Sequence, residues 1–218
     1  TFVERHTIEL GTVDGSDIFY SLNNNEYQKY YKKIIINKQS VISSYAQKNK
    51  IKSKTVTSEY FPRDDSKKIK ILSTYANQYA AAGDKTLIDQ LRGGNNYRTG
   101  NWQGYREDLN VIVDISKVKK INSISLGCHQ DVRSWIFYPK QVDYWSSLDG
   151  EKYTYQGKVL ANFPDNIEGS LQKDFKLNIK NLKARYIKIK AENYGICPDW
   201  HLGAGGKTWI FVDEITIK

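Results

Sequence analysis

The residues best suited to ligand chemistry lie in one glycine-rich stretch near the end of this 218-residue chain. Residues 195–214 read Gly-Ile-Cys-Pro-Asp-Trp-His-Leu-Gly-Ala-Gly-Gly-Lys-Thr-Trp-Ile-Phe-Val-Asp-Glu. We expect a flexible loop with Trp200 and His201 at its start, followed by an apolar strand from Trp209. An exposed Trp beside a His on such a loop suits a flat, half-apolar ligand rich in hydroxyl groups, such as a sugar ring. The residue types leave a second reading open, in which Trp200 is a loop anchor packed into the protein.

Catalytic chemistry has little support in the sequence. A glycosidase of the ordinary type needs two carboxylates placed across the sugar bond. The acidic residues of the second half form no recognisable acid/base motif, and turn or cap chemistry accounts for them: Asp108, Asp114, Asp131, Asp199, Asp213 and Glu214. His129 and His201 lack a Ser or Cys nucleophile in an elbow or triad context. The sequence therefore predicts no enzymatic activity for this chain.

The formal charge of +9 raises the question of nucleic-acid binding. Much of the excess lies in residues 27–54, where lysines alternate with apolar residues as on the solvated faces of short strands. There is little Arg for bidentate phosphate contacts and no nucleic-acid motif, so we predict no nucleic-acid partner. No apolar run has the length of about 18 residues that a membrane span needs.

The cysteines and histidines give no metal motif. Cys128 and Cys197 are well apart, as are the three His, so a structural zinc site is not expected. The two cysteines could form one disulfide or remain as two buried thiols, and the sequence is compatible with either. The first residues lack the apolar core of a signal peptide, and the chain has no Met, so we expect a processed product or a piece of a longer protein.

The elements that must position these residues are strands. Short β-branched or alternating runs separated by turn residues predict strands at residues 17–22, 34–36, 41–46, 55–61, 110–115, 121–128, 141–147, 185–191 and 209–217. Residues 70–79 suit a strand or a short helical turn. Asp149-Gly150 predicts a type I′ hairpin turn. Pro62 and the charged run after it read as a linker. We therefore expect an all-β chain of two β-sandwiches, with a small one at residues 1–63, a linker at 64–69 and a second at 70–218.

An ordered set of motifs in the second half amounts to a family resemblance. In chain order they are Leu-Ile-Asp-Gln-Leu-Arg-Gly at 87–93, Trp-Gln-Gly-Tyr at 102–105, Val-Ile-Val-Asp-Ile at 111–115, Ser-Ser-Leu-Asp-Gly at 146–150, Arg-Tyr-Ile-Lys-Ile at 185–189 and Val-Asp-Glu-Ile at 212–215. This set resembles the discoidin domain, also called the coagulation-factor type C domain, over residues 70–218. The resemblance implies an eight-stranded, galactose-binding-like jelly roll whose ligand site lies among the loops at one end.

The resemblance also implies which residues meet there. Three loop segments, residues 95–106, 129–138 and 196–207, carry aromatic groups for stacking and polar groups for hydroxyls. The expected sugar-binding residues are Trp200, His201, Asp131, Arg98, Trp135, Tyr105 and His129. Trp102 and Trp209 are expected in the sandwich core instead.

A structural calcium ion is implied beside the loop at residues 89–96. Asp89 and Glu214 would supply hard carboxylate oxygens, with loop carbonyls completing the shell. On residue types alone, Asp89 could equally cap a turn while Glu214 is solvated. Gln90 stands where family members commonly carry Gly, which leaves the detail of that turn open.

Two local sequences narrow the resemblance. Residues 135–137 and 198–201 look most like modules at the C-terminus of bacterial β-N-acetylhexosaminidases, and residues 1–63 more weakly resemble the small β-sandwich that follows hexosaminidase or chitobiase catalytic domains. This implies a non-catalytic region that binds terminal galactose- or N-acetylhexosamine-type sugars of glycans. Its partner would be a catalytic domain covalently attached upstream, in a secreted, periplasmic or cell-surface bacterial glycosidase. The alternative is a structural spacer or protein-interaction module without sugar binding.

Overall fold

The computed structural model describes residues 1–218 and divides the chain into two units, residues 1–65 and 66–218. The boundary lies within the stretch that the sequence marks as a linker, although strand β8 begins at Lys68 and brings the end of that stretch into the second unit. Regular structure consists of strands and short 3-10 helices, so the chain is all-β as predicted. None of the helices has the length and apolar character needed to cross a membrane.

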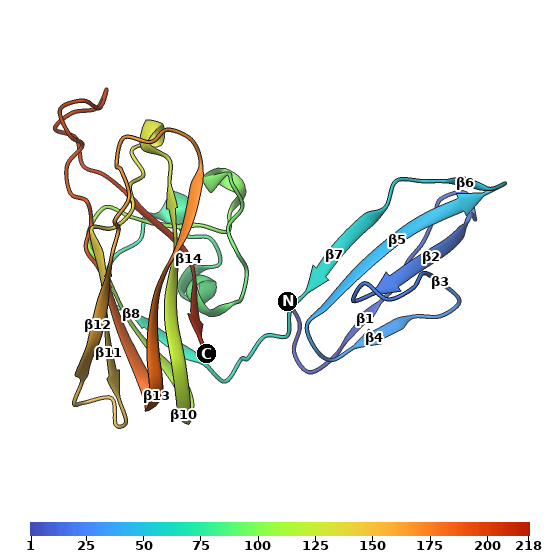
Figure 1. Cartoon of the computed structure of the whole chain (residues 1–218), viewed down its shortest axis with the longest axis horizontal. Helices are drawn as coiled ribbons and strands as arrows, with labels where there is room; N and C mark the ends of the chain where they lie inside the picture. The colour runs from blue at the N-terminus through green and yellow to red at the C-terminus, as the bar shows by residue number, and fades with distance from the viewer. The chain divides into compact units, whose positions relative to one another are not determined.

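The first unit is a small β-sandwich (Figure 1). A two-stranded sheet pairs β1 with β4, and a five-stranded sheet has the order β3-β2-β5-β6 with β7 also paired to β5. The strands are β1 His6–Ile8, β2 Asp17–Leu22, β3 Gln28–Lys29, β4 Ile34–Ile36, β5 Ser40–Lys48, β6 Ile51–Lys52 and β7 Val56–Tyr60. Ile34 and Ile36 point into the core while Ile35 between them is exposed, as the two-residue period of a strand requires.

The second unit holds the longer strands and all the 3-10 helices (Figure 1). Its seven-stranded sheet has the order β12-β11-β13-β10-β14-β9, and β8 pairs with β10. The elements are β8 Lys68–Ile71, η1 Asn77–Tyr79, η2 Gly83–Ile88, η3 Tyr97–Thr99, β9 Gln103–Tyr105, β10 Leu109–Gln130, η4 Val132–Ser134, β11 Gln141–Ser147, β12 Thr154–Leu160, β13 Leu171–Ala191 and β14 Ile210–Ile217. The predicted strands at 110–115 and 121–128 are thus one continuous strand, and the stretch at 70–79 contains both a strand end and a helical turn.

Two long antiparallel strands, β10 and β13, take part in both layers of this jelly roll. The first part of β10 pairs with the end of β13 and with β8, while its second part pairs with the start of β13 and with β14. The register shifts between Asp114 and Lys119, where the ribbon passes from one layer to the other. Ser116 has φ +71° there, and the Asp114 carboxylate accepts its backbone N–H at 2.7 Å and a two-point ion pair from Arg185 at 2.9 Å.

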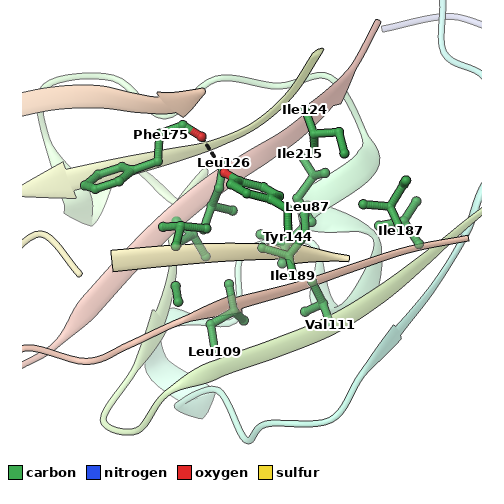
Figure 2. Close-up of a cluster of buried hydrophobic side chains, with 14 of the residues drawn as sticks. Leu87, Leu109, Val111, Ile124, Leu126, Tyr144, Phe175, Ile187, Ile189 and Ile215 are labelled. Carbon is green, nitrogen blue, oxygen red and sulfur yellow. Dashed lines mark hydrogen bonds between the residues drawn. The ribbon is translucent and has the colours of Figure 1, made fainter. Parts of the chain in front are cut away.

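The core of the second unit lies between these layers and is almost entirely apolar (Figure 2). Val111 and Ile189 from one layer face Ile124 and Leu126 from the other, all at 0% exposure. The Tyr144 hydroxyl, which is also buried, donates to the Phe175 carbonyl, so its polar end is satisfied (Figure 2). Truncating one such buried Leu or Ile to Ala typically costs about 2–5 kcal/mol. This core fixes the strands whose ends carry the loops described below.

The turn after β11 differs from its prediction, and the state of the two cysteines is resolved. The turn after β11 is not a two-residue type I′ turn, because Gly150 has φ +84° while Asp149 does not have a positive φ. Asp149 instead accepts the N–H groups of Glu151 and Lys152, at 2.8 and 3.0 Å, and caps a longer turn. Cys128 and Cys197 are both buried free thiols, so of the two alternatives the structure has no disulfide.

Candidate functional site

The glycine-rich loop between β13 and β14 is a series of tight turns joined by backbone hydrogen bonds. Cys197 and Gly206 bond across its base, N to O at 2.8 Å, and Thr208 N donates to the Gly195 carbonyl at 3.0 Å. Further along, Ala204 N donates to the His201 carbonyl at 2.9 Å. These backbone bonds fix where the loop presents Trp200 (Figure 1 shows the loop at one end of the second unit).

Trp135 is the support on which this loop rests. It follows η4 with φ +64°, an unusual conformation for a bulky residue. Its indole lies so close to the loop that a Cβ added at Gly203 or at Gly206 would come within 2.4 Å of the ring. A side chain at either position would displace the indole, so glycine is favoured at both. The backbone of Trp135 also bonds the start of β14, because Trp209 N donates to the Trp135 carbonyl at 2.8 Å.

His201 holds the loop to η4 and has no nitrogen left for a sugar. Gly203 N donates to Nδ1 at 2.9 Å, so Nε2 carries the proton and donates to the Val132 carbonyl at 2.6 Å. The side chain is buried, with 7% exposure. The prediction that His201 bonds ligand hydroxyls is therefore wrong. Trp135 is only partly buried beneath the loop, so its expected contact with sugar stays a prediction.

Trp200 is the aromatic group that this framework presents to solvent. Its side chain is 48% exposed, with the buried part tilted against Phe137 at 6.2 Å and His201 at 5.6 Å between ring centroids. It is therefore partly anchored and partly open. Beside it lies a depression of about 350 Å³. The residues that line this Trp200 depression come from η4, from the loop between β12 and β13, and from the glycine-rich loop: Val132, Arg133, Glu168, Trp200, His201 and Leu202.

The remaining lining of the Trp200 depression combines charge with apolar surface. Arg133 Nη2 and Glu168 Oε2 form an ion pair at 2.5 Å, with side chains 73% and 60% exposed. Leu202 is fully exposed next to Trp200 on the loop tip. The depression thus offers an aromatic face, an aliphatic group, a set of guanidinium donors and a carboxylate acceptor.

Arg98 lies in a second depression of about 290 Å³ and does not reach the first. This hollow is lined by residues of η1, η3 and the following loop: Gln78, Tyr79, Ala81, Tyr97, Arg98, Gly100 and Trp102. The Arg98 guanidinium stacks on the Tyr97 ring at 4.3 Å. The structure therefore does not place Arg98 and Trp200 in one hollow, as the sequence-based site requires.

Of three other predicted contacts, two are fully buried and the third, Asp131, lies outside both depressions. Tyr105 and His129 are both 0% exposed, so the prediction that they touch sugar is wrong. His129 packs against Trp102 with ring centroids 4.9 Å apart, and burial lowers its pKa. Asp131 is half-buried, accepts the Ser134 hydroxyl at 3.0 Å, and lines neither depression. Trp102 and Trp209, expected in the core, are indeed buried at 1% and 9% exposure.

Sequence reasoning missed Arg133 and Glu168 as a pair, and it missed Leu202. Arg133 belongs to a segment that the sequence already marked, and Leu202 directly follows the Trp-His pair. Glu168 had no signal, because its loop meets η4 only through the fold. The Tyr194 hydroxyl donates to Asp165 and so ties that same loop to the segment that follows β13.

Buried carboxylates lie beneath the loop between η2 and η3. Glu214 is 4% exposed and accepts the Gln90 N–H at 2.8 Å, and Asp89 is 9% exposed and accepts the Leu91 N–H at 2.8 Å. Burial raises the pKa of Glu214 to about 8, with nearby Asp89 adding to the shift. Gln90 itself has φ +64°, which explains why a glycine would suit this position. No group of three or more His, Cys, Asp or Glu side chains is arranged so that it could hold a metal ion by itself.

Comparison with known protein families identifies the family of the second unit. A family model for the F5/8 type C domain matches residues 66–212. The chain belongs to this family. The discoidin resemblance and the jelly-roll fold are thereby confirmed. A comparison with curated protein sequences finds no match.

Several solved structures are similar to the F5/8 type C unit. One is CpGH89CBM32-5 from Clostridium perfringens in complex with GalNAc-β-1,3-galactose, 15% identical, covering 70% of this chain and 94% of that one with a TM-score of 0.43. A family 32 CBM from C. perfringens NanJ in complex with galactose is 14% identical over 70% and 93%, with a TM-score of 0.43. The C-terminal domain of a chitobiase from Bacteroides fragilis is 20% identical over 69% and 92%, with a TM-score of 0.39.

Proposed function

We propose that the F5/8 type C unit binds the terminal sugar of a glycan, without catalysis, in the Trp200 depression. The observation that carries this proposal is the half-exposed indole beside a hollow of about 350 Å³ with polar groups on its rim. The C–H face of a sugar ring stacks on Trp200 while its hydroxyls bond Arg133 and Glu168. A spacer would have no reason to keep such an indole open, so this exposure argues against the alternative function.

The depression suits binding better than hydrolysis. Glu168 is the single carboxylate among its lining residues, whereas an ordinary glycosidase needs two across the scissile bond. Stacking and a few solvent-competed hydrogen bonds give a dissociation constant on the order of 10 µM to 1 mM. Such modest affinity becomes effective when many copies of a glycan are present on a surface, because rebinding raises the local concentration.

The wider setting that we propose follows the resemblance of the motifs at residues 135–137 and 198–201. The sugar is of galactose or N-acetylhexosamine type, and the chain is part of a bacterial glycoside hydrolase of the β-N-acetylhexosaminidase or chitobiase kind that acts outside the cytoplasm. In that setting the F5/8 type C unit holds the attached catalytic domain near its substrate.

Calorimetric titration of the chain with galactose, N-acetylgalactosamine and N-acetylglucosamine tests the binding function. We expect saturable binding of at least one sugar, with a change in Trp fluorescence. Incubation with aryl glycosides of the same sugars should release no chromophore. Release of chromophore would contradict the non-catalytic role, and absence of binding to all three sugars and to a glycan array would support the spacer.

We further propose that Asp89 and Glu214 hold a structural calcium ion. Two buried carboxylates close enough to interact are the hard oxygen donors that calcium prefers, and backbone carbonyls and water would complete its shell. When bound, the ion would tie the η2–η3 loop to β14. We expect the melting temperature to rise with added calcium and to fall with a chelator. No change with either treatment, together with no metal in the purified protein, would contradict the site.

A further inference from the structure

We propose that the Arg133–Glu168 ion pair makes the Trp200 depression selective for neutral sugars over sugars that carry an acidic group. This inference rests on the proposed sugar binding and adds the chemical class of ligand. It also assigns a role to Glu168, a residue with no signal in the sequence.

The pair stands at the rim of the depression and joins two separate loops. Arg133 is the middle residue of η4, and Glu168 comes from the loop between β12 and β13, with Nη2 and Oε2 2.5 Å apart. No other Asp, Glu, Lys or Arg lines the depression, since the remaining lining residues are Val132, Trp200, His201 and Leu202. Because both His201 nitrogens are bonded to backbone groups, the ion pair holds the polar groups that can meet a ligand.

The two charges suit a hydroxyl and disfavour an anion. A hydroxyl can accept a hydrogen bond from Arg133 and donate its own proton to Glu168, so it satisfies both groups without separating them. A carboxylate or sulfate on the sugar cannot donate to Glu168. It must compete with Glu168 for the Arg133 guanidinium and is repelled by the Glu168 charge a few ångströms away. The net charge of +9 favours anions in general, so this selectivity would be a local property.

Removing the Glu168 charge should leave the fold intact. Both side chains are largely exposed, and exposed ion pairs contribute little to stability. The loop that carries Glu168 has a second attachment through the Tyr194–Asp165 hydrogen bond. Changes in ligand selectivity can therefore be separated from unfolding.

The test compares matched ligands that share a ring and differ in charge. The probes are galactose, N-acetylgalactosamine and N-acetylglucosamine, each against its own 6-sulfate, titrated by calorimetry at fixed ionic strength. We expect the native chain to bind its neutral sugar at least about tenfold more tightly than the 6-sulfate. In Glu168→Gln this ratio should fall to about threefold or less, because Arg133 is freed to pair with the sulfate.

Glu151→Gln is the matched control, since Glu151 is an exposed carboxylate in the turn between β11 and β12, at the end of the unit away from the Trp200 loop (Figure 1). It should keep the native ratio. Equal binding of neutral and sulfated sugars by the native chain would overturn the proposed selectivity. A ratio of dissociation constants that Glu168→Gln leaves unchanged would also overturn it, because the preference would then come from the bulk of the sulfate. Binding of none of the six probes and of no glycan on an array would overturn this inference together with the proposed function. Equal binding of neutral and sulfated sugars would leave the proposed function standing.

Discussion

Replacing Trp200 by Ala is the sharpest test of the Trp200 depression, because its expected effect can be worked from the structure. An aromatic side chain offers roughly 150–250 Å² of surface, so an exposure of 48% leaves about 100 Å² of Trp200 open. A sugar stacked on one face covers about half of this and buries a similar area of its own. At about 25 cal/mol per Å², the contact is worth about 2.5 kcal/mol, or about a 60-fold change in Kd.

The same substitution also removes the packed part of the indole. That part contacts Phe137 and His201, and at the same coefficient its loss costs about 2.5 kcal/mol of unfolding free energy. We therefore expect Trp200→Ala to lose measurable sugar binding in calorimetry while it keeps a cooperative thermal transition at a somewhat lower temperature.

Trp145→Ala is the control for a generic tryptophan effect. Trp145 is half-buried on β11, packs against Tyr155 with ring centroids 5.4 Å apart, and does not line the Trp200 depression. It should lose stability but keep the native Kd. Native-like binding by Trp200→Ala would refute the stacking argument. If Trp200→Ala has no cooperative transition, Trp200 is an anchor that packs the loop onto the protein, and it is not a ligand-binding residue.

Three further predictions follow from other contacts. Gly206→Ala brings a Cβ against the Trp135 ring, so we expect chemical denaturation to show a loss of about 1–3 kcal/mol in unfolding free energy, together with weaker sugar binding. Gly94→Ala, which has open space around its Cβ, should have a stability closer to that of the native chain. In a chelator, the free energy of unfolding should fall as pH rises from about 4.5 to 8. Burial raises the pKa of Glu214 from 4.5 to about 8 and that of Asp213 to about 6, so the folded state binds more protons than the unfolded state in this window. Calcium should flatten this fall, and a stability that rises across the window would contradict the prediction. Residues 66–218 expressed alone should unfold cooperatively, since their core is complete within the unit, and a molten product in circular dichroism would show that the unit depends on residues 1–65.

The strands were predictable wherever only one face is buried. Residues 17–22 and 34–36 have the bounds that their patterns indicate, because turn residues follow each β-branched or aromatic run. The site residues His129 and Tyr105 failed for the opposite reason. Residues 123–130 of β10 are almost all buried on both faces, because the loop with Tyr97 and Trp102 covers the outer one. A polar residue type in such a segment does not indicate access to a ligand.

The aromatic part of the site was predictable and its charged part was not. Trp200 is identified by its place in the sequence, since a Trp within a glycine-rich loop between strands has few side chains to pack against. The Arg133–Glu168 pair depends on two loops that are 35 residues apart and meet only because the long β10–β13 ribbon brings both to the same end. The sequence also could not show that both His201 nitrogens are hydrogen-bonded to backbone groups, because those bonds depend on how the loop turns.

The pairing of β8 with β10 has a mechanical consequence. Residues 68–71 run antiparallel to residues 111–114, next to the point where the first unit is attached, while the Trp200 loop lies at the far end of the same strands (Figure 1). If the loop is held by an immobile glycan while flow pulls on the first unit, the force runs along the axis of β8. The hydrogen bonds to β10 are then stretched together in shear and do not open one after another. A weakly bound sugar would let go before the tethered strand is pulled out, so detachment under force would be reversible.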